Sequence, residues 1–246
     1  MVKFVIFCTK IIAAAIVALL FTSCNANINW GNGIDGNGNV TKQIRNVENN
    51  FSKIEVKRGL NVILEQSNNY SVEVEADENL QEHITTKVEN GTLVITTDEN
   101  IDEAKAKTIR VTMPILTAVE TTSGSSLTTN GLFTGTDITV KTSSGSETNL
   151  SLEIDNITCE STSGSTIKIK GKALQLNTAS SSGSSIEAKD LLVNDVISQT
   201  TSGSSTNVRP IVSLKAKASS GSSIDYAGTP KTISKEESSG GSVSKD

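Results

Sequence analysis

The sequence predicts an all-β protein folded as a parallel β-helix, a solenoid with coils of about 20 residues. A Ser-Gly pair recurs along the second half of the chain, with its glycines 18 to 21 residues apart. Short runs of alternating apolar and polar residues, typical of half-buried strands, lie between the pairs. Aromatic residues make up only 3% of the chain, so an aliphatic core is expected. The repeat glycines are Gly124, Gly145, Gly164, Gly183, Gly203, Gly221 and Gly240.

The N-terminus resembles an export signal that ends in a lipid-attachment site. Lys3 and Lys10 precede an uncharged run over 11–21, which is about half as long as a membrane-spanning helix requires. The run ends in Leu-Phe-Thr-Ser before Cys24, an order that resembles a bacterial lipobox. We therefore expect a lipoprotein signal peptide over 1–23 and acylation of Cys24, with ordinary signal cleavage as the alternative.

Residues 24–50 are predicted to be a flexible tether, because their first half is rich in glycine and asparagine. Acyl chains on Cys24 would hold the protein at a membrane. With Cys8 in the signal peptide, Cys159 is the one thiol left for the folded domain, so no internal disulfide is expected. Cys159 falls in a column with Val119 and Val140, which indicates a small buried side chain.

Residues 51–114 alternate apolar and polar side chains with the period of β-strands. Asn90-Gly91 lies between two such runs and predicts a hairpin turn. The stretch 77–86 predicts a helical turn with Asp77 as its N-cap. We expect these strands to cover one end of the solenoid, since an open sheet edge invites pairing with other chains.

Residues 115–246 form the repeat array, in which each coil has a strand, a Ser-Gly corner, a second strand and a less regular return. The corner glycine is expected because the chain there needs a positive φ or a close backbone approach. Flanking serines are expected to bond the corner backbone or neighbouring serines. They are Ser125, Ser146, Ser165, Ser184, Ser204 and Ser222. Two sets of equivalent positions are expected to face the interior, and we call them the inward columns. They lie three residues after the glycine (Leu127, Thr148, Ile167, Ile186, Thr206, Ile224, Val243) and five after it (Thr129, Leu150, Ile169, Ala188, Val208, Tyr226).

The last coil departs from the pattern of the others. Lys235 and Lys245 stand where earlier coils have Val140 and Leu150. Charged side chains at inward positions discourage edge-to-edge pairing, so this coil is predicted to end the solenoid.

The composition excludes several classes of chemistry. The net charge of −5 and the pI near 5.1 come without a basic stripe, so no nucleic-acid partner is expected. His83 is the one histidine and has no ligand-spaced companion, so no metal site, cofactor or Ser-His pair is predicted. No residue is assigned a catalytic role, and the ligand-binding residues stay unassigned.

Paired carboxylates leave one enzymatic alternative, because β-helices also form polysaccharide lyases and glycosidases. A glycosidase needs two carboxyl groups facing one cleft, and a lyase needs a basic partner such as Lys168, Lys170 or Arg209. A solvated acidic surface is the preferred interpretation. The available carboxylates are Asp137, Glu147, Glu153, Asp155, Glu160, Glu187, Asp190 and Asp195.

The order of motifs resembles that of a known family, the auto-transporter adhesin, head GIN domain family. The resemblance rests on Phe-Ser-Lys-Ile-Glu-Val from Phe51, Gly-Leu-Asn-Val-Ile-Leu-Glu-Gln from Gly59 and Val-Thr-Met-Pro-Ile-Leu from Val111, followed by the Ser-Gly-Ser repeats. It covers about 51–228. It implies an exported envelope protein, commonly a lipoprotein, with a β-helical domain, and it transfers no ligand or catalytic residue.

The favoured function is therefore a non-catalytic adhesin or binding scaffold, anchored by lipid in the outer membrane and facing the periplasm or the cell surface. Its expected partners are the membrane, through the lipid, and a glycan or an extracellular or envelope protein. A polysaccharide lyase or glycosidase, or a purely structural envelope component, are the alternatives.

Overall fold

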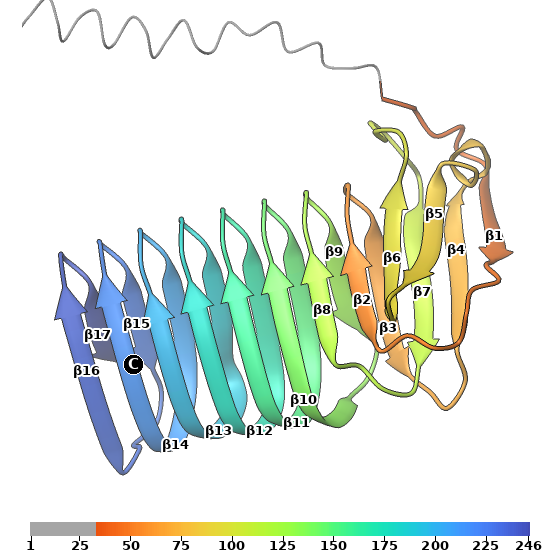
Figure 1. Cartoon of the computed structure of the whole chain (residues 1–246). Helices are drawn as coiled ribbons and strands as arrows, with labels where there is room; N and C mark the ends of the chain where they lie inside the picture. Colours follow the sequence, from red (N-terminus) through yellow and green to blue (C-terminus); the bar gives the residue numbers. More distant parts are fainter. Residues whose placement is uncertain (1–32) are drawn as a thin grey trace, which may run out of the picture. The chain divides into compact units, whose positions relative to one another are not determined.

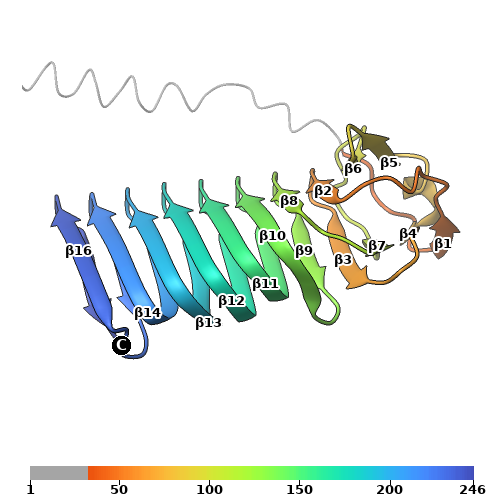
Figure 2. The same cartoon turned by 60° about the horizontal axis from the view of Figure 1, so that its bottom comes forward.

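The computed structural model describes residues 33–246 and shows a β-solenoid of about seven turns with coils of about 19 residues. The predicted fold class is confirmed. Figures 1 and 2 show the coils stacked side by side, with the Ser-Gly corners along one edge of the column. Residues 34–246 form one compact unit. The signal peptide and Cys24 lie outside the described residues.

Successive coils pair through parallel strands in register. In the middle of the column one long strand runs from each corner to the next, bending on the way. These strands are β11 (Glu147–Ser161), β12 (Thr166–Ser180), β13 (Ser185–Thr200) and β14 (Ser205–Ser219). Shorter strands flank them: β8 (Ala118–Thr121), β9 (Ser126–Thr129), β10 (Phe133–Thr142), β15 (Ser223–Tyr226), β16 (Thr232–Ser238) and β17 (Ser242–Lys245).

The corners are built from two successive residues in the left-handed region. The serine before each repeat glycine has φ between 48° and 57°, and the glycine has φ between 69° and 77°. In all but the last coil, the glycine N–H donates to the carbonyl of the corresponding serine in the next coil, at 3.0–3.1 Å. A Cβ on the glycines of the first six Ser-Gly corners would meet no atom within 4 Å. Positive φ, rather than a close approach, therefore explains the glycine at these corners.

The interior is aliphatic in its centre and hydroxyl-lined near the corners. The two predicted inward columns are buried, and Cys159 is fully buried beside Val140. The flanking serines are buried as well, and several bond the neighbouring coil. Ser165 Oγ donates to the carbonyl of Thr142 at 2.7 Å, and Ser222 Oγ donates to that of Thr200 at 2.7 Å. The Thr142 carbonyl also accepts the Thr162 N–H at 3.1 Å, so Ser165 adds a second bond there and its own buried hydroxyl gains a partner.

The solenoid begins earlier than the Ser-Gly repeats do. Strands β2 (Lys53–Val56) and β3 (Asn61–Gln66) flank a corner at Arg58-Gly59, which has φ values of 58° and 71°. The Gly59 N–H donates to the Ser123 carbonyl at 2.9 Å, so this corner continues the same file. β2 and β3 pair in parallel with β8 and β9.

The remaining N-terminal strands cover the end of the column, as predicted. β6 (Thr92–Thr97) and β7 (Lys107–Met113) add in parallel to β2 and β3. β5 (Ile84–Glu89) and β4 (Ser71–Asp77) then pair with them antiparallel, and β1 (Val40–Ile44) pairs antiparallel with β4. The hairpin at Asn90-Gly91 joins β5 to β6.

The described part of the predicted tether is folded. Ile34 forms a parallel bridge with Ile101, and β1 lies within the segment that was expected to be flexible. The side chains of Ile34 and Val47 pack against the core. Local glycine and asparagine content suggests a linker, but contacts with residues more than 30 positions away order the chain from Ile34 onward.

The predicted helical turn over 77–86 is largely wrong. A single 3-10 turn, η2, spans Glu78–Leu80, and Ile84 already begins β5. Asp77 makes no side-chain capping bond. Its buried carboxylate instead accepts backbone N–H groups of Gly38, Lys105 and Ala106 at 2.9–3.3 Å. The Asp77 carboxylate therefore accepts three long-range N–H donors in place of the helix N–H groups that an N-cap would accept.

The last coil closes with charged side chains. Lys235 Nζ donates to the Val243 carbonyl at 2.8 Å and lies 4.8 Å from the centre of the Tyr226 ring. Glu237 accepts the Val243 N–H at 2.6 Å. Both residues occupy register positions opposite Ala216 and Ala218, which face the core in the preceding coil. Two ionic groups therefore link β16 to β17 across the end of the interior.

Gly171 should be essential in a way the corner glycines are not. It lies within β12 at φ +122°, and a Cβ there would collide with the carbonyl of Leu152 in the preceding coil. We expect Gly171→Ala to destabilise the fold by about 3 kcal/mol, through backbone strain and coil separation. Thermal unfolding measures this. Gly135→Ala is the control, because its Cβ would meet Ile154 at an ordinary 3.9 Å, and equal losses in the two variants would contradict the prediction.

Asp77 should make stability depend on pH. Burial raises the pKa of its carboxyl, but the three backbone donors and Lys105 outweigh burial and hold that pKa below its ordinary value. A lowered folded-state pKa stabilises the fold above about pH 4, and this contribution is lost as pH falls through the folded-state pKa. Asp77→Asn should therefore lower the melting temperature at pH 7, with the difference narrowing in acid. Asp35→Asn, at an exposed carboxylate of the same region, should change little at either pH.

Candidate functional site

The outer faces of the coils are the places where a ligand could bind. Within residues 33–246, no group of three or more His, Cys, Asp or Glu side chains is arranged to hold a metal ion. No helix in that range is long and apolar enough to cross a membrane. The surface instead has shallow open depressions between the outward side chains of neighbouring coils.

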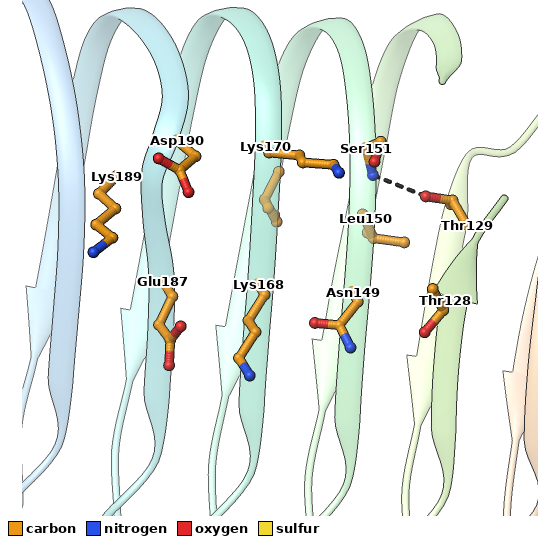
Figure 3. A pocket seen from close by; sticks show the side chains of 11 residues that line it. Thr128, Thr129, Asn149, Leu150, Ser151, Lys168, Lys170, Glu187, Lys189 and Asp190 are labelled. Carbon is orange, nitrogen blue, oxygen red and sulfur yellow. Dashed lines mark hydrogen bonds between the residues drawn. The ribbon is translucent and has the colours of Figure 1, made fainter. Parts of the chain in front are cut away.

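One depression of about 240 Å³ crosses β9, β11, β12 and β13 (Figure 3). Its lining combines hydroxyl, amide, ammonium and carboxylate groups, and we call it the charged groove. The lining residues are Thr128, Thr129, Asn149, Leu150, Ser151, Lys168, Ile169, Lys170, Glu187, Lys189 and Asp190.

Strand register explains how these side chains meet. Asn149 pairs in register with Lys168, and Lys168 pairs with Glu187, so outward residues of successive coils form a file. Leu150 and Ile169 alternate with them and face the core, so they lie buried beneath the charged groove. Coils lie about 4.8 Å apart, so the file repeats at that interval.

A β-bulge shapes the upper end of the charged groove. The register shifts between Lys168 and Lys170, so that Lys170 pairs with Asp190 and not with Lys189. Lys189 and Asp190 are both exposed as a result. Figure 3 shows the Lys170 side chain turned toward Ser151 and away from Asp190.

One ion pair holds the edge of the charged groove. Lys168 Nζ lies 3.0 Å from Glu147 Oε1, and the two side chains are each 46% exposed. The hydrogen bond from Lys168, followed by that from Asn149, lowers the pKa of Glu147, and the same pairing with Glu147 raises the pKa of Lys168. A surface pair of this kind contributes little to stability, but it fixes the direction of the Lys168 side chain.

Two further depressions lie on other faces. One of about 480 Å³ surrounds the small side chain of Ala179 and is bordered by Glu160, Gln199 and Lys217. The other, of about 330 Å³, exposes aliphatic side chains on three successive coils, and we call it the aliphatic depression. These are Leu174, Leu192 and Ile211, with exposed fractions of 51%, 39% and 46%.

The structure brings together only some of the carboxylates named from the sequence. Glu187 and Asp190 share the charged groove with Lys168 and Lys170, and Glu153 and Asp155 share the aliphatic depression. Others are engaged elsewhere: Glu160 with Lys141 at 2.8 Å, Asp137 with Asn156 at 3.0 Å, and Asp195 with Ser213 at 2.5 Å. Arg209 follows Val208, one coil beyond the charged groove.

The geometry favours binding over acid-base catalysis. A carboxyl group that acts as a general acid near neutral pH is usually desolvated, and these carboxylates lie in open depressions. His83 Nδ1 lies 2.9 Å from Asp98 Oδ1 on the N-terminal strands, far along the chain from the charged groove. Cys159 is buried, and desolvation raises the pKa of its thiol, so the thiolate that reacts is disfavoured.

Sequence analysis does not single out Thr128, Asn149 or Ser151 as site residues. Polar residues on a strand face look the same whether they line a groove or simply contact water. Counting from the repeat glycine places Thr128, Asn149, Lys168 and Glu187 each four residues after it, which is the one signal that could have aligned them.

The profile of one protein family, described as "Putative auto-transporter adhesin, head GIN domain", matches residues 50–230. The chain belongs to this family. The head GIN domain match starts just before β2 and ends after β15, so it covers most of the solenoid.

Solved structures share the head GIN domain fold. An adhesin-named protein from Bacteroides fragilis superposes with a TM-score of 0.82 at 19% identity, covering 87% of this chain and 100% of that one. A protein from Parabacteroides distasonis, named as lipid binding, gives 0.68 at 21% identity, covering 87% and 99%. An adhesin-named protein from Parabacteroides merdae gives 0.69 at 19% identity, covering 87% and 98%. A comparison with curated proteins finds no match.

Cys159 should be chemically silent in the folded protein. Its side chain is fully buried and the pKa of its thiol is raised, so alkylating reagents should not label it. Peptide mapping by mass spectrometry after iodoacetamide treatment measures this. Labelling should appear only after denaturation, and rapid labelling of the native protein would contradict the buried position.

Proposed function

We propose that this head GIN domain protein is a non-catalytic, lipid-anchored adhesin that binds extended glycans along the outer faces of its coils. The observation that supports this most directly is the charged groove, which offers hydroxyl, amide and charged groups from successive coils. Such a mixture suits sugars, because each hydroxyl group of a sugar needs hydrogen-bond partners. An open groove also accepts a polymer that continues beyond one coil.

Three further points support this assignment. The family and two of the structural neighbours described above are named for adhesion. A rigid column anchored at one end would hold its faces away from the membrane. No metal-ligand cluster is present among residues 33–246, and the exposed carboxylates do not suit acid catalysis.

A second candidate function is lipid binding, which the aliphatic depression favours. Leu174, Leu192 and Ile211 are large exposed apolar side chains on successive coils. Apolar surface gathered in one place is typical of a binding site. A structural neighbour that is named as a lipid-binding protein gives the same suggestion.

The full chain, purified in mild detergent, should bind members of a glycan array without degrading them. Polysaccharide digestion assays and phospholipid vesicles are parallel arms of the same experiment. Release of new reducing or unsaturated ends would establish an enzyme and overturn the non-catalytic assignment. Binding to vesicles alone would favour the second candidate, and binding to no glycan would contradict the adhesin proposal.

Acylation of Cys24 is the proposed means of membrane attachment. Cys24→Ala should release the protein from the membrane fraction or block its processing, because the acyl chains would be missing. Fractionation and metabolic labelling with a fatty-acid analogue measure this, with Cys159→Ala as the control. Unchanged membrane retention of the Cys24 variant would contradict the lipid anchor.

A further inference from the structure

Three basic residues occupy equivalent outward positions on three successive coils. Lys170, Lys189 and Arg209 each stand six residues after the repeat glycine of their coil. Each is exposed and directly follows a buried residue, namely Ile169, Ala188 and Val208. Ala188 and Val208 pair in register directly before Lys189 and Arg209, and the register of β13 and β14 shifts after that pair. We call these three residues the basic row.

The basic row lacks the ion pairs that three other lysines of the solenoid form. Lys141, Lys168 and Lys217 each pair with a glutamate of a neighbouring coil, at 2.8–3.3 Å. Within residues 33–246, neither Lys170, Lys189 nor Arg209 forms an ion pair with a carboxylate. Asp190 lies in register with Lys170, yet Figure 3 shows the side chains of Lys170 and Lys189 directed away from it. Three successive coils of a chain with a net charge of −5 therefore each present, at this position, an exposed cation without an ion pair among the described residues.

We propose that the basic row binds the carboxylates of an acidic polysaccharide, a polymer with about one uronic acid per sugar. This inference rests on the proposed adhesin function and specifies its ligand class. Coils repeat at about 4.8 Å, which is close to the length of one sugar unit in an extended chain. Successive carboxylates of such a polymer therefore meet successive cations of the row.

The neighbouring groups in the charged groove fit the same ligand. Asn149 and Ser151 provide an amide and a hydroxyl for sugar hydroxyl groups. Glu187 and Asp190 can accept hydrogen bonds from sugar hydroxyls. These two carboxylates also repel polymers of higher charge density, so DNA should bind more weakly than a uronic-acid polymer of similar length.

Binding of the full chain to polygalacturonate, a neutral galactan and single-stranded DNA tests the proposal, at low and high salt. We expect polygalacturonate to bind more tightly than the other two and to weaken as salt rises. Replacing Lys170, Lys189 and Arg209 together by glutamine should weaken polygalacturonate binding roughly tenfold, since each exposed charge contributes a fraction of that factor.

A matched control removes the same charge elsewhere. The control variant has glutamine in place of Lys141, Lys215 and Lys217, which lie on strands before the corner. This variant should keep its affinity for polygalacturonate. Circular dichroism confirms that both triple variants are folded. If both variants lost the same affinity for polygalacturonate, or if DNA bound as tightly as polygalacturonate, binding would come from general charge attraction. Either result would overturn the proposal.

The remaining outcomes separate this inference from the adhesin function. Binding to the galactan that survives replacement of the basic row would support a glycan-binding adhesin and overturn the acidic-ligand assignment. Absence of polygalacturonate binding would overturn the acidic-ligand assignment as well, while the glycan array would still decide the adhesin function.

Discussion

Every coil turns through a serine and a glycine that both have positive φ, and the rest of the solenoid depends on this corner. Two successive left-handed residues turn the chain sharply, so the strands on either side of the corner can enclose a narrow interior. The glycine N–H then bonds the serine carbonyl of the next coil, which links corner to corner at the spacing of parallel strands. Because the corners stack in register, the residues at equal distances from them stack as well. Inward columns and outward files follow from that single alignment.

Polar groups beside the corners are buried and need hydrogen-bond partners, and the two ends of the interior need to be covered. Beside the corners, buried hydroxyls such as those of Ser165 and Ser222 bond carbonyls of the neighbouring coil. At the N-terminal end, antiparallel strands cover the last parallel coil. At the other end, Lys235 and Glu237 bond the backbone of Val243. Hydrogen bonding therefore complements an aliphatic core that has few aromatic side chains to add volume.

A solenoid of this kind places its functional groups on the outside. Aliphatic and hydroxyl side chains fill the interior of the described coils, and the depressions on their outer faces are open. Extended ligands suit such surfaces, because contacts repeat with every coil. The family is named for adhesion, and the acidic glycan that we propose as ligand would contact β12, β13 and β14.

The sequence by itself determined the repeat, the inward columns and the corner glycines, because these are periodic and each coil repeats the same local requirement. Tertiary structure decided the features that depend on residues distant along the chain. Arg58-Gly59 acts as a corner without the Ser-Gly signature because β2 and β3 stack on β8 and β9. Gly171 is required by the carbonyl of Leu152 in the adjacent coil, and a bulge in β13 places Asp190 beside Lys170. A periodic pattern fixes what each coil has in common, whereas register shifts and end contacts arise only when the coils are packed together.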